Sequence, residues 1–387
     1  MSSPASVLPG ASPSATSSGA PYRIMVVDDS AVIRGLLIRS LESDAQIEVV
    51  ASVGDGRMAV NALSRYDVEV VVLDIEMPVM DGLTALPLLI AARPGIKVII
   101  ASTLTRRNAD ISLRALAAGA ADYIAKPGST ALTTADGFKQ ELVEKIKALG
   151  EAKRKTAGIE QPPKRARLET AHTAPLRPAI SRPIALRAAS LAPFEALAIG
   201  SSTGGPQALF QLLSALRGTL SRPIFITQHM PATFTMILAE HICRSTGWSA
   251  AEACDGEIVR QGRVYVAPGD FHMLVESAPG GDAQVIRLNK APAENFCRPA
   301  VDPMLRSLAQ SHGRRLLAVI LTGMGHDGLN GSTAVTAAGG TVVAQDEATS
   351  VVWGMPGAVA TAGLCSAVLP LVEISSYIAK LAKRAAA

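Results

Sequence analysis

A glycine-framed turn carrying two serines is the stretch of this sequence best suited to nucleophilic chemistry. Residues 200–206 read G-S-S-T-G-G-P and follow the apolar run 196–199. Ser202 lies at the centre of a G-x-S-x-G pattern, which holds a serine hydroxyl out at a sharp strand-to-helix turn, where a neighbouring base can make it a nucleophile. A tight structural connection and a phosphate-binding turn are the alternatives, although neither G-K-S/T nor G-x-G-x-x-G is completed.

Two further polar residues follow apolar runs in the same half of the chain. His229 follows residues 224–227, and Asp327 follows residues 316–321. The pKa of histidine lies near neutrality and a carboxylate can fix its tautomer, so Ser202, His229 and Asp327 have the composition of a nucleophilic triad. Spacing alone leaves rivals open, namely His326 as base and Asp302 and Asp346 as acids.

The first third of the chain indicates a different chemistry, based on carboxylates. Asp28 and Asp29 follow one short apolar run, Asp74 follows a second, and Ser102 and Lys126 follow two more. Converging carboxylates repel one another unless a hard divalent cation joins them, so Mg²⁺ is the expected ligand. A single aspartate in such a place is more often a helix cap, and only the combination of acids, hydroxyl and lysine indicates a site.

Alternating strand and helix signals supply the elements that would position these residues. Apolar runs, each followed by a stretch of helical length, recur five times before residue 150. They predict a (βα)5 unit whose parallel sheet is covered on both faces. Ligands of such sheets collect beyond the carboxyl ends of the strands, where the acids and the lysine lie. The predicted strands are 24–27, 47–50, 68–73, 98–101 and 123–125.

The second half of the chain predicts a doubly wound α/β domain with a small antiparallel part. Three apolar strands lead into Ser202, His229 and Asp327. Because the ends of parallel strands meet at one edge, we expect these three side chains to converge. Shorter, turn-rich strand signals at 263–267 and 284–288 predict the antiparallel part.

Composition divides the chain into two domains and two connecting or terminal segments. With 387 residues and a hydrophobic share of 48%, two cores can be built. Residues 1–20 lack charged side chains and predict a disordered tail, whereas residues 151–190 predict a Pro/Ala-rich linker with nine Lys/Arg against three Glu. The expected domains are 21–150 and 191–387. Because the net charge of +4 is concentrated in the linker, no nucleic-acid partner is indicated.

The sequence also indicates where in the cell the protein works and how its cysteines are used. No apolar run reaches the roughly 20 residues of a membrane span, and no secretory signal is evident, so we expect a cytoplasmic protein without membrane insertion. We also expect a monomer. No C-x-x-C pairing indicates a zinc site or a disulfide framework. The cysteines are Cys243, Cys254, Cys297 and Cys365.

The first domain resembles a response-regulator receiver domain. The matching motifs are V-V-D-D-S at 26–30, L-D-I-E-M-P at 73–78, D-G at 81–82 and K-P at 126–127. The resemblance implies that a histidine kinase phosphorylates Asp74. It further implies Mg²⁺ held by Asp29, Asp74 and the backbone carbonyl of Glu76, with Asp28 assisting. The implied phosphate partner and switch residues are Lys126, Ser102 and Tyr123.

The second domain resembles the catalytic domain of the chemotaxis protein-glutamate methylesterases. The matching motifs are I-G-S-S-T-G-G-P at 199–206, Q-H-M at 228–230, A-P-G-D at 267–270, R-P-A-V-D at 298–302, L-T-G-M-G-H-D-G at 321–328 and A-Q-D-E-A-T-S-V-V-W-G-M-P-G-A at 344–358. The resemblance implies Ser202 as nucleophile, His229 as general base and acid, and Asp327 as orienting carboxylate. The backbone N–H of Met324 would help form the oxyanion hole, with Thr203 beside the site. No cofactor is implied for the esterase.

Together the two resemblances predict a phosphorylation-activated serine esterase. Its implied substrates are glutamyl methyl esters on the cytoplasmic helices of chemoreceptors, which it would hydrolyse with release of methanol, and receptor glutamines, which it would deamidate. Ser201, often alanine in this family, has no evident role. A response regulator with a DNA-binding or non-catalytic output is the alternative hypothesis.

Overall fold

Five parallel strands form the N-terminal sheet, in the order β2-β1-β3-β4-β5. Strand β3 is buried along its whole length, as expected for a strand with helices on both faces. Side chains that follow the strands cap several helices: Ser30, Asp55, Asp81 and Thr105 each accept a hydrogen bond from a backbone N–H of the first turn. The elements are β1 (Tyr22–Val27), α1 (Ala31–Glu42), β2 (Ile47–Val53), α2 (Gly56–Ala62), β3 (Val70–Asp74), α3 (Gly82–Ala92), β4 (Lys97–Ser102), α4 (Arg106–Ala117), β5 (Asp122–Ala125) and α5 (Thr134–Ile159).

The computed structural model describes residues 20–126, 134–159, 184–278 and 283–383. Residues 1–19 of the predicted tail, Pro127 of the K-P motif and residues 160–183 of the predicted linker lie outside the described residues. Within the described ranges, no helix has both the length and the apolar character needed to cross a membrane.

Helix α5 continues beyond residue 150, where the sequence predicts the first domain to end. Arg154, assigned above to the linker, donates hydrogen bonds to both carboxylate oxygens of the buried Glu69, at 2.6 and 2.8 Å. Its guanidinium also lies over the ring of Tyr22. The basic residues that indicate a linker by composition therefore fasten the last turns of α5 to the first domain.

Seven parallel strands form the second sheet, in the order β14-β13-β12-β6-β7-β9-β8. Strands β10 and β11 form a separate antiparallel pair. The predicted doubly wound domain with a small antiparallel part is thus confirmed. Its strands are β6 (Ala196–Ser201), β7 (Ile224–Gln228), β8 (Ser249–Glu252), β9 (Arg263–Val266), β10 (His272–Ser277), β11 (Gln284–Asn289), β12 (Leu316–Ile320), β13 (Thr341–Gln345) and β14 (Ala367–Leu369).

One strand belongs to a different sheet from the one predicted. Strand β9, expected in the antiparallel part, pairs in parallel with both β7 and β8. Val264, Tyr265 and Val266 are all inaccessible to solvent, so β9 is buried on both faces despite its turn-rich surroundings. The helices of this domain are α6 (Gly205–Leu216), α7 (Ala232–Thr246), α8 (Val301–His312), α9 (Leu329–Ala337), α10 (Met355–Thr361) and α11 (Leu371–Lys383), with a 3₁₀ turn at Gly313–Arg315.

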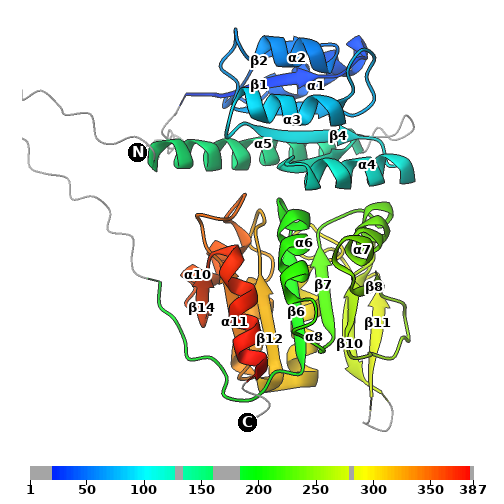
Figure 1. Cartoon of the computed structure of the whole chain (residues 1–387), viewed down its shortest axis with the longest axis vertical. Coiled ribbons are helices and arrows are strands. Elements are labelled where there is room, and N and C mark those ends of the chain that lie inside the picture. Colours follow the sequence, from blue (N-terminus) through cyan, green and yellow to red (C-terminus); the bar gives the residue numbers. More distant parts are fainter. Residues whose placement is uncertain (1–19, 127–133, 160–183, 279–282, 384–387) are drawn as a thin grey trace, which may run out of the picture.

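The first domain lies across the end of the second sheet at which α6 and α7 begin (Figure 1). Helix α4 packs against α7 and α6. A single buried apolar cluster contains Leu113 and Leu116 of the first domain together with Leu209 and Phe234 of the second. The two domains therefore share a core at the edge where the predicted catalytic residues lie.

Candidate active site

The turn between β6 and α6 has a tightly constrained backbone. Ser202 N–H donates to the carbonyl of Thr322 at 3.0 Å, and Gly205 N–H donates to the carbonyl of Ser202 at 2.7 Å. Gly204 adopts φ 77°, a left-handed conformation that costs glycine little. A Cβ at Gly205 would collide with Gln228 Oε1 and with the Ser201 side chain. The glycines are therefore required for the turn to bring β6, β7 and β12 together.

The two adjacent serines have different surroundings. Ser201 is fully buried, and its hydroxyl donates to Gln228 Oε1 at 2.7 Å. Gln228 Nε2 in turn donates to the carbonyl of Ser202 at 2.9 Å. Ser201 thus supports the turn from within, whereas Ser202 is partly exposed.

His229 and Asp327, predicted to converge, are in direct contact. His229 Nε2 lies 2.7 Å from Asp327 Oδ2. Burial alone would raise the pKa of the Asp327 carboxyl, but hydrogen bonds from His229 and from the backbone N–H groups of Val301 and Asp302 outweigh it and lower that pKa. Those two N–H groups open helix α8, and a helix N-terminus favours a carboxylate. Asp327 is accordingly held as an anion.

The other nitrogen of the imidazole faces a cysteine. His229 Nδ1 lies 3.4 Å from Cys297 Sγ. Among the described residues, no hydrogen bond joins Ser202 to His229. Burial alone lowers the pKa of His229, but hydrogen bonds and charge at Asp327 and Cys297 outweigh it and raise that pKa above its usual value. The pair is therefore assembled, while the contact with Ser202 is not made in this conformation.

The rival residues are placed elsewhere. His326 is exposed, and Asp346 accepts hydrogen bonds from Thr349 N–H and Oγ1, at 3.0 and 2.6 Å, as the cap of a loop. Asp302 is buried beside the pair, but it accepts from Gly328 and Gly331 N–H groups rather than from His229. Asp327 is the carboxylate that contacts the imidazole.

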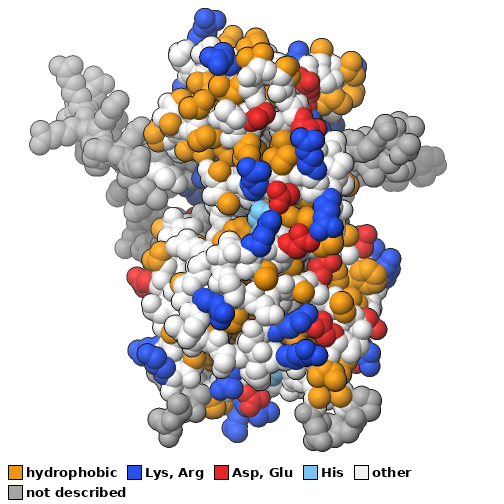
Figure 2. All heavy atoms as spheres, turned by 45° about the vertical axis from the view of Figure 1, so that its right-hand side comes forward, with side chains coloured by type: hydrophobic (Ala, Val, Ile, Leu, Met, Phe, Trp, Pro, Cys, Tyr) orange, Lys and Arg blue, Asp and Glu red, His pale blue; other side chains and the backbone are white. Residues whose placement is uncertain are grey.

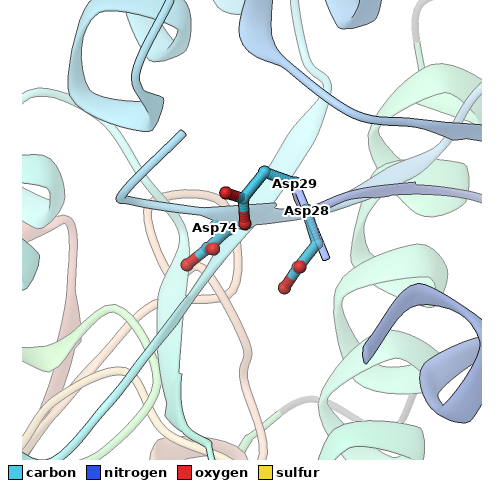
Figure 3. A group of neighbouring side chains, drawn as sticks. All are labelled: Asp28, Asp29 and Asp74. Carbon is cyan, nitrogen blue, oxygen red and sulfur yellow. The ribbon is translucent and has the colours of Figure 1, made fainter. Parts of the chain in front are cut away.

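A second site lies at the carboxyl ends of β1 and β3 in the first domain. Ligand oxygens of Asp28, Asp29 and Asp74 all lie within 4.8 Å of one another (Figure 3). Lys126 Nζ lies 2.6 Å from Asp28 Oδ2 and 2.8 Å from Asp74 Oδ1. Burial dominates at Asp74 and raises the pKa of its carboxyl, although Lys126 acts in the opposite direction. Clustered carboxylate oxygens are the donors that Mg²⁺ prefers, so these residues fit the expected ion.

The other residues predicted for this domain have diverse surroundings. The Ser102 hydroxyl lies 2.8 Å from that of Ser112 on α4, and both are buried. The side chain of Glu76 is exposed and lies 3.9 Å from Arg107, whereas the role predicted for Glu76 uses its backbone carbonyl. That role stays a prediction.

The interface between the domains reaches the residue next to Ser202. The Thr203 hydroxyl donates to Asp122 Oδ2 at 2.6 Å, and the same oxygen lies 2.9 Å from Lys145 Nζ. Tyr123 stacks on Phe234 of α7, with ring centroids 4.4 Å apart. A predicted switch residue and a predicted active-site residue are therefore both engaged across the interface.

Charged side chains border the same interface. Asp110 on α4 accepts from His241 Nε2 at 2.8 Å and from Arg244 at 3.2 Å, both on α7, and Arg106 pairs with Glu240 at 2.7 Å. Figure 2 shows charged side chains of both signs and a histidine at mid-height, where the domains meet. The contact is thus apolar inside and polar at its rim.

The comparisons with known proteins agree with this arrangement. The family model described as CheB methylesterase matches residues 197–378, and that of the response regulator receiver domain matches residues 24–135. A protein-glutamate methylesterase/protein-glutamine glutaminase of Paramagnetospirillum magneticum is 61% identical over 369 residues, which cover 94% of this chain and 96% of the relative. The chain belongs to this family.

Other members of the methylesterase family are similarly close. The protein of the same name from Azospirillum brasilense is 60% identical over 391 residues, covering 98% of this chain and 97% of the relative. Among solved structures, the catalytic domain of Thermotoga maritima CheB methylesterase is 41% identical, with 49% of this chain and 98% of that chain covered and a TM-score of 0.47. The two family-model matches and the relatives of 60% and 61% identity confirm the predicted family and its two-domain fold.

Two residues beside the His229–Asp327 pair were not predicted from the sequence. Asn295 donates to Asp327, and Cys297 contacts His229. Their only sequence signal is that they directly precede the R-P-A-V-D motif at 298–302, in a region with weak strand signals.

Proposed function

We propose that this protein is a phosphorylation-activated serine esterase that hydrolyses glutamyl methyl esters of chemoreceptors and deamidates receptor glutamines. The observation that carries the proposal is the 2.7 Å contact between His229 Nε2 and Asp327 Oδ2, beside the turn that presents Ser202. This chain belongs to the methylesterase family, and in the pair His229 is the base. Asp327 holds its imidazole in one tautomer and stabilises it when it is protonated.

The chemistry follows from the orientation of the imidazole. In the neutral imidazole, donation from Nε2–H to the Asp327 carboxylate leaves the lone pair on Nδ1, and this nitrogen takes the proton of Ser202 as its oxygen attacks the ester carbonyl. The protonated imidazole then gives the proton to the leaving methoxide, which departs as methanol. Water attacks the acyl-enzyme by the same route and releases glutamate. With a glutamine side chain, the leaving group is ammonia.

The loop that follows β12 passes close to the turn that carries Ser202, and this supports an oxyanion site there. A Cβ added at Gly323 would lie only 3.0 Å from Ser202 N and from Ser202 Cβ. The backbone that leads into Met324 therefore passes directly beside Ser202. We assign the Met324 N–H to the oxyanion and Thr203 to the edge of the site.

Methanol release from methylated receptor tests the nucleophile, with the neighbouring serine as a matched control. Ser202→Ala should abolish release. Ser201→Ala should retain most of it, because the Ser201 hydroxyl is committed to Gln228. Loss in the Ser201 variant alone would sink the assignment.

We further infer that the first domain controls the second. A histidine kinase would phosphorylate Asp74, with Asp28 and Asp29 holding Mg²⁺, which supplies charge neutralisation for the transfer. Lys126 would pair with the phosphate. A change at Ser102 and Tyr123 would then disturb the stack on Phe234, and with it the interface over Thr203.

The domain assignment remains part of the proposal. We keep the predicted order of receiver (21–150), linker (151–190) and catalytic domain (191–387), but we move the boundary between receiver and linker from residue 150 to Ile159, where α5 ends. The alternative of a DNA-binding output is not favoured, because the C-terminal domain matches the methylesterase family.

A further inference from the structure

A short turn beside the catalytic pair is built around two residues in left-handed conformations. Glu294 and Cys297 exchange backbone hydrogen bonds of 3.1 and 2.9 Å, which close the turn. Asn295 and Phe296 have φ values of 51° and 63°. Arg306 on α8 holds Glu294 through two hydrogen bonds of 2.9 and 2.5 Å. The turn is thus fixed at its base and leaves the side chain of Asn295 in a defined position.

Asn295 bridges two buried carboxylates. Its Nδ2 donates to Asp327 Oδ1 at 2.9 Å and lies 3.1 Å from Asp302 Oδ2. Both aspartates are almost completely inaccessible, at 1% and 0% of their surface. Carboxylates that share a buried site repel each other, and a neutral amide with two N–H groups can satisfy both without adding charge.

Asn295 differs in kind from most of the hydrogen-bond donors to Asp327. Oδ2 accepts from His229 and from Val301 N–H, whereas Oδ1 accepts from the N–H groups of Asp302 and Gly328 and from Asn295. Within the described residues, Asn295 and His229 are the side-chain donors, and the remaining donors are backbone groups. Asn295 therefore holds the oxygen opposite the one that contacts the base.

We propose that Asn295 is a positioning residue of the methylesterase site, acting through Asp327. Its amide fixes the plane of the Asp327 carboxylate and keeps it ionised next to Asp302, so that Oδ2 stays directed at His229 Nε2. This inference rests on the proposed function, since it assigns Asp327 the task of orienting the base.

A purely conformational explanation makes a different prediction. Asparagine is among the residues that tolerate the left-handed region, so the amide could be incidental. Asn295→Gly separates the two explanations, because glycine keeps the turn conformation and removes the donor. Asn295→Asp keeps the size of the side chain and makes the donor titratable. Asn330→Asp, at an exposed position of α9, is the matched control for the same change of charge.

The experiment is methanol release from methylated receptor by the full chain between pH 5.5 and 8.5, with unfolding temperatures measured in parallel. Asn295→Gly should lower kcat by roughly 10- to 100-fold at every pH, the range seen when the hydrogen-bond partner that orients a metal ligand is removed. Asn295→Asp should approach the parent at low pH, where its protonated carboxyl donates a hydrogen bond to Asp327. Its activity relative to the parent should then fall toward that of Asn295→Gly as the carboxyl ionises. Asn330→Asp should follow the parent.

Two outcomes would overturn the inference: parental kcat in Asn295→Gly, or an Asn295→Asp to parent ratio that does not change with pH. Ser202→Ala identifies a failure of the proposed function separately. If that variant still releases methanol, the assignment of the nucleophile has failed, whatever Asn295 does.

Discussion

Cys297 Sγ lies 3.4 Å from His229 Nδ1, on the far side of the ring from the nitrogen that contacts Asp327 at 2.7 Å. The sulfur atom therefore contacts the ring nitrogen that the proposed mechanism reserves for Ser202. Sulfur is a weak hydrogen-bonding partner, so this contact can be exchanged for one with a hydroxyl at little cost. The contact between Cys297 and His229 therefore belongs to the site before Ser202 engages the imidazole.

The contact predicts the behaviour of Cys297→Ala. Removing the thiol frees Nδ1 and removes one cause of the raised pKa of His229. Methanol release at neutral pH should rise by about fivefold, the equivalent of one neutral hydrogen bond, and the acid limb of the pH–rate profile should move to lower pH. Cys254→Ala, at an exposed position, is the control. A slower enzyme with an unchanged profile would show that the thiol supports the ring.

Asp327→Asn should lower kcat by roughly 10³- to 10⁴-fold, because an amide cannot stabilise the imidazolium that forms during attack. Single-turnover methanol release measures the effect directly. An Asp327→Asn enzyme within tenfold of the parent would contradict the role given to this carboxylate.

The same pair predicts how stability depends on pH. The raised pKa of His229 means that its contribution is present below the unfolded pKa of about 6.5 and is lost as pH rises through the folded value. The lowered pKa of Asp327 means that its contribution is lost as pH falls through its folded value. The difference in unfolding temperature between parent and Asp327→Asn should therefore be largest near pH 5 to 6 and should narrow at alkaline pH. A constant difference would count against an ion pair.

Asp110→Ala should raise the activity of the unphosphorylated protein by loosening the interface. Asp110 receives His241 and Arg244 from the catalytic domain, but it is about one-third exposed, so the gain should not exceed about fivefold. Asp44→Ala is the matched control, because Asp44 pairs with Lys147 inside the receiver. Equal basal activity in both variants would mean that this contact does not restrain the enzyme.

Asp74→Asn should prevent both phosphorylation by a small-molecule phosphoryl donor and the activation that follows. Removal of Mg²⁺ with a chelator should have the same effect in the parent, since three carboxylates form the cluster. Asp81→Asn should be phosphorylated normally, because Asp81 caps α3 and asparagine caps equally well. Phosphate incorporation and methanol release are measured on the same samples. Persistent activation of Asp74→Asn would place the acceptor elsewhere.

Much of the site could be predicted because it depends on strand ends. Asp28 and Asp74 come directly after apolar runs and Ser202 and His229 come within three residues of one, and parallel strands bring their carboxyl ends to one edge. The identity of the strands is local information, carried by runs of apolar neighbours. It was sufficient for the five strands of the first sheet and for β6, β7 and β12 of the second. Strand β9 was assigned to the wrong sheet, because its burial on both faces depends on β7 and β8, and β8, β10, β13 and β14 were not predicted.

Contacts between distant residues were decided only by the tertiary structure. Sequence places His229 near Ser202 but does not say which ring nitrogen faces which partner, and the packing of the 294–297 turn directs Nδ1 at Cys297. The bridge from Asn295 to Asp302 and Asp327 requires α8 and α9 to begin side by side. Likewise, the Tyr123–Phe234 stack forms only when two separately folded sheets meet. Local periodicity encodes elements, whereas the partners of a side chain depend on how those elements pack.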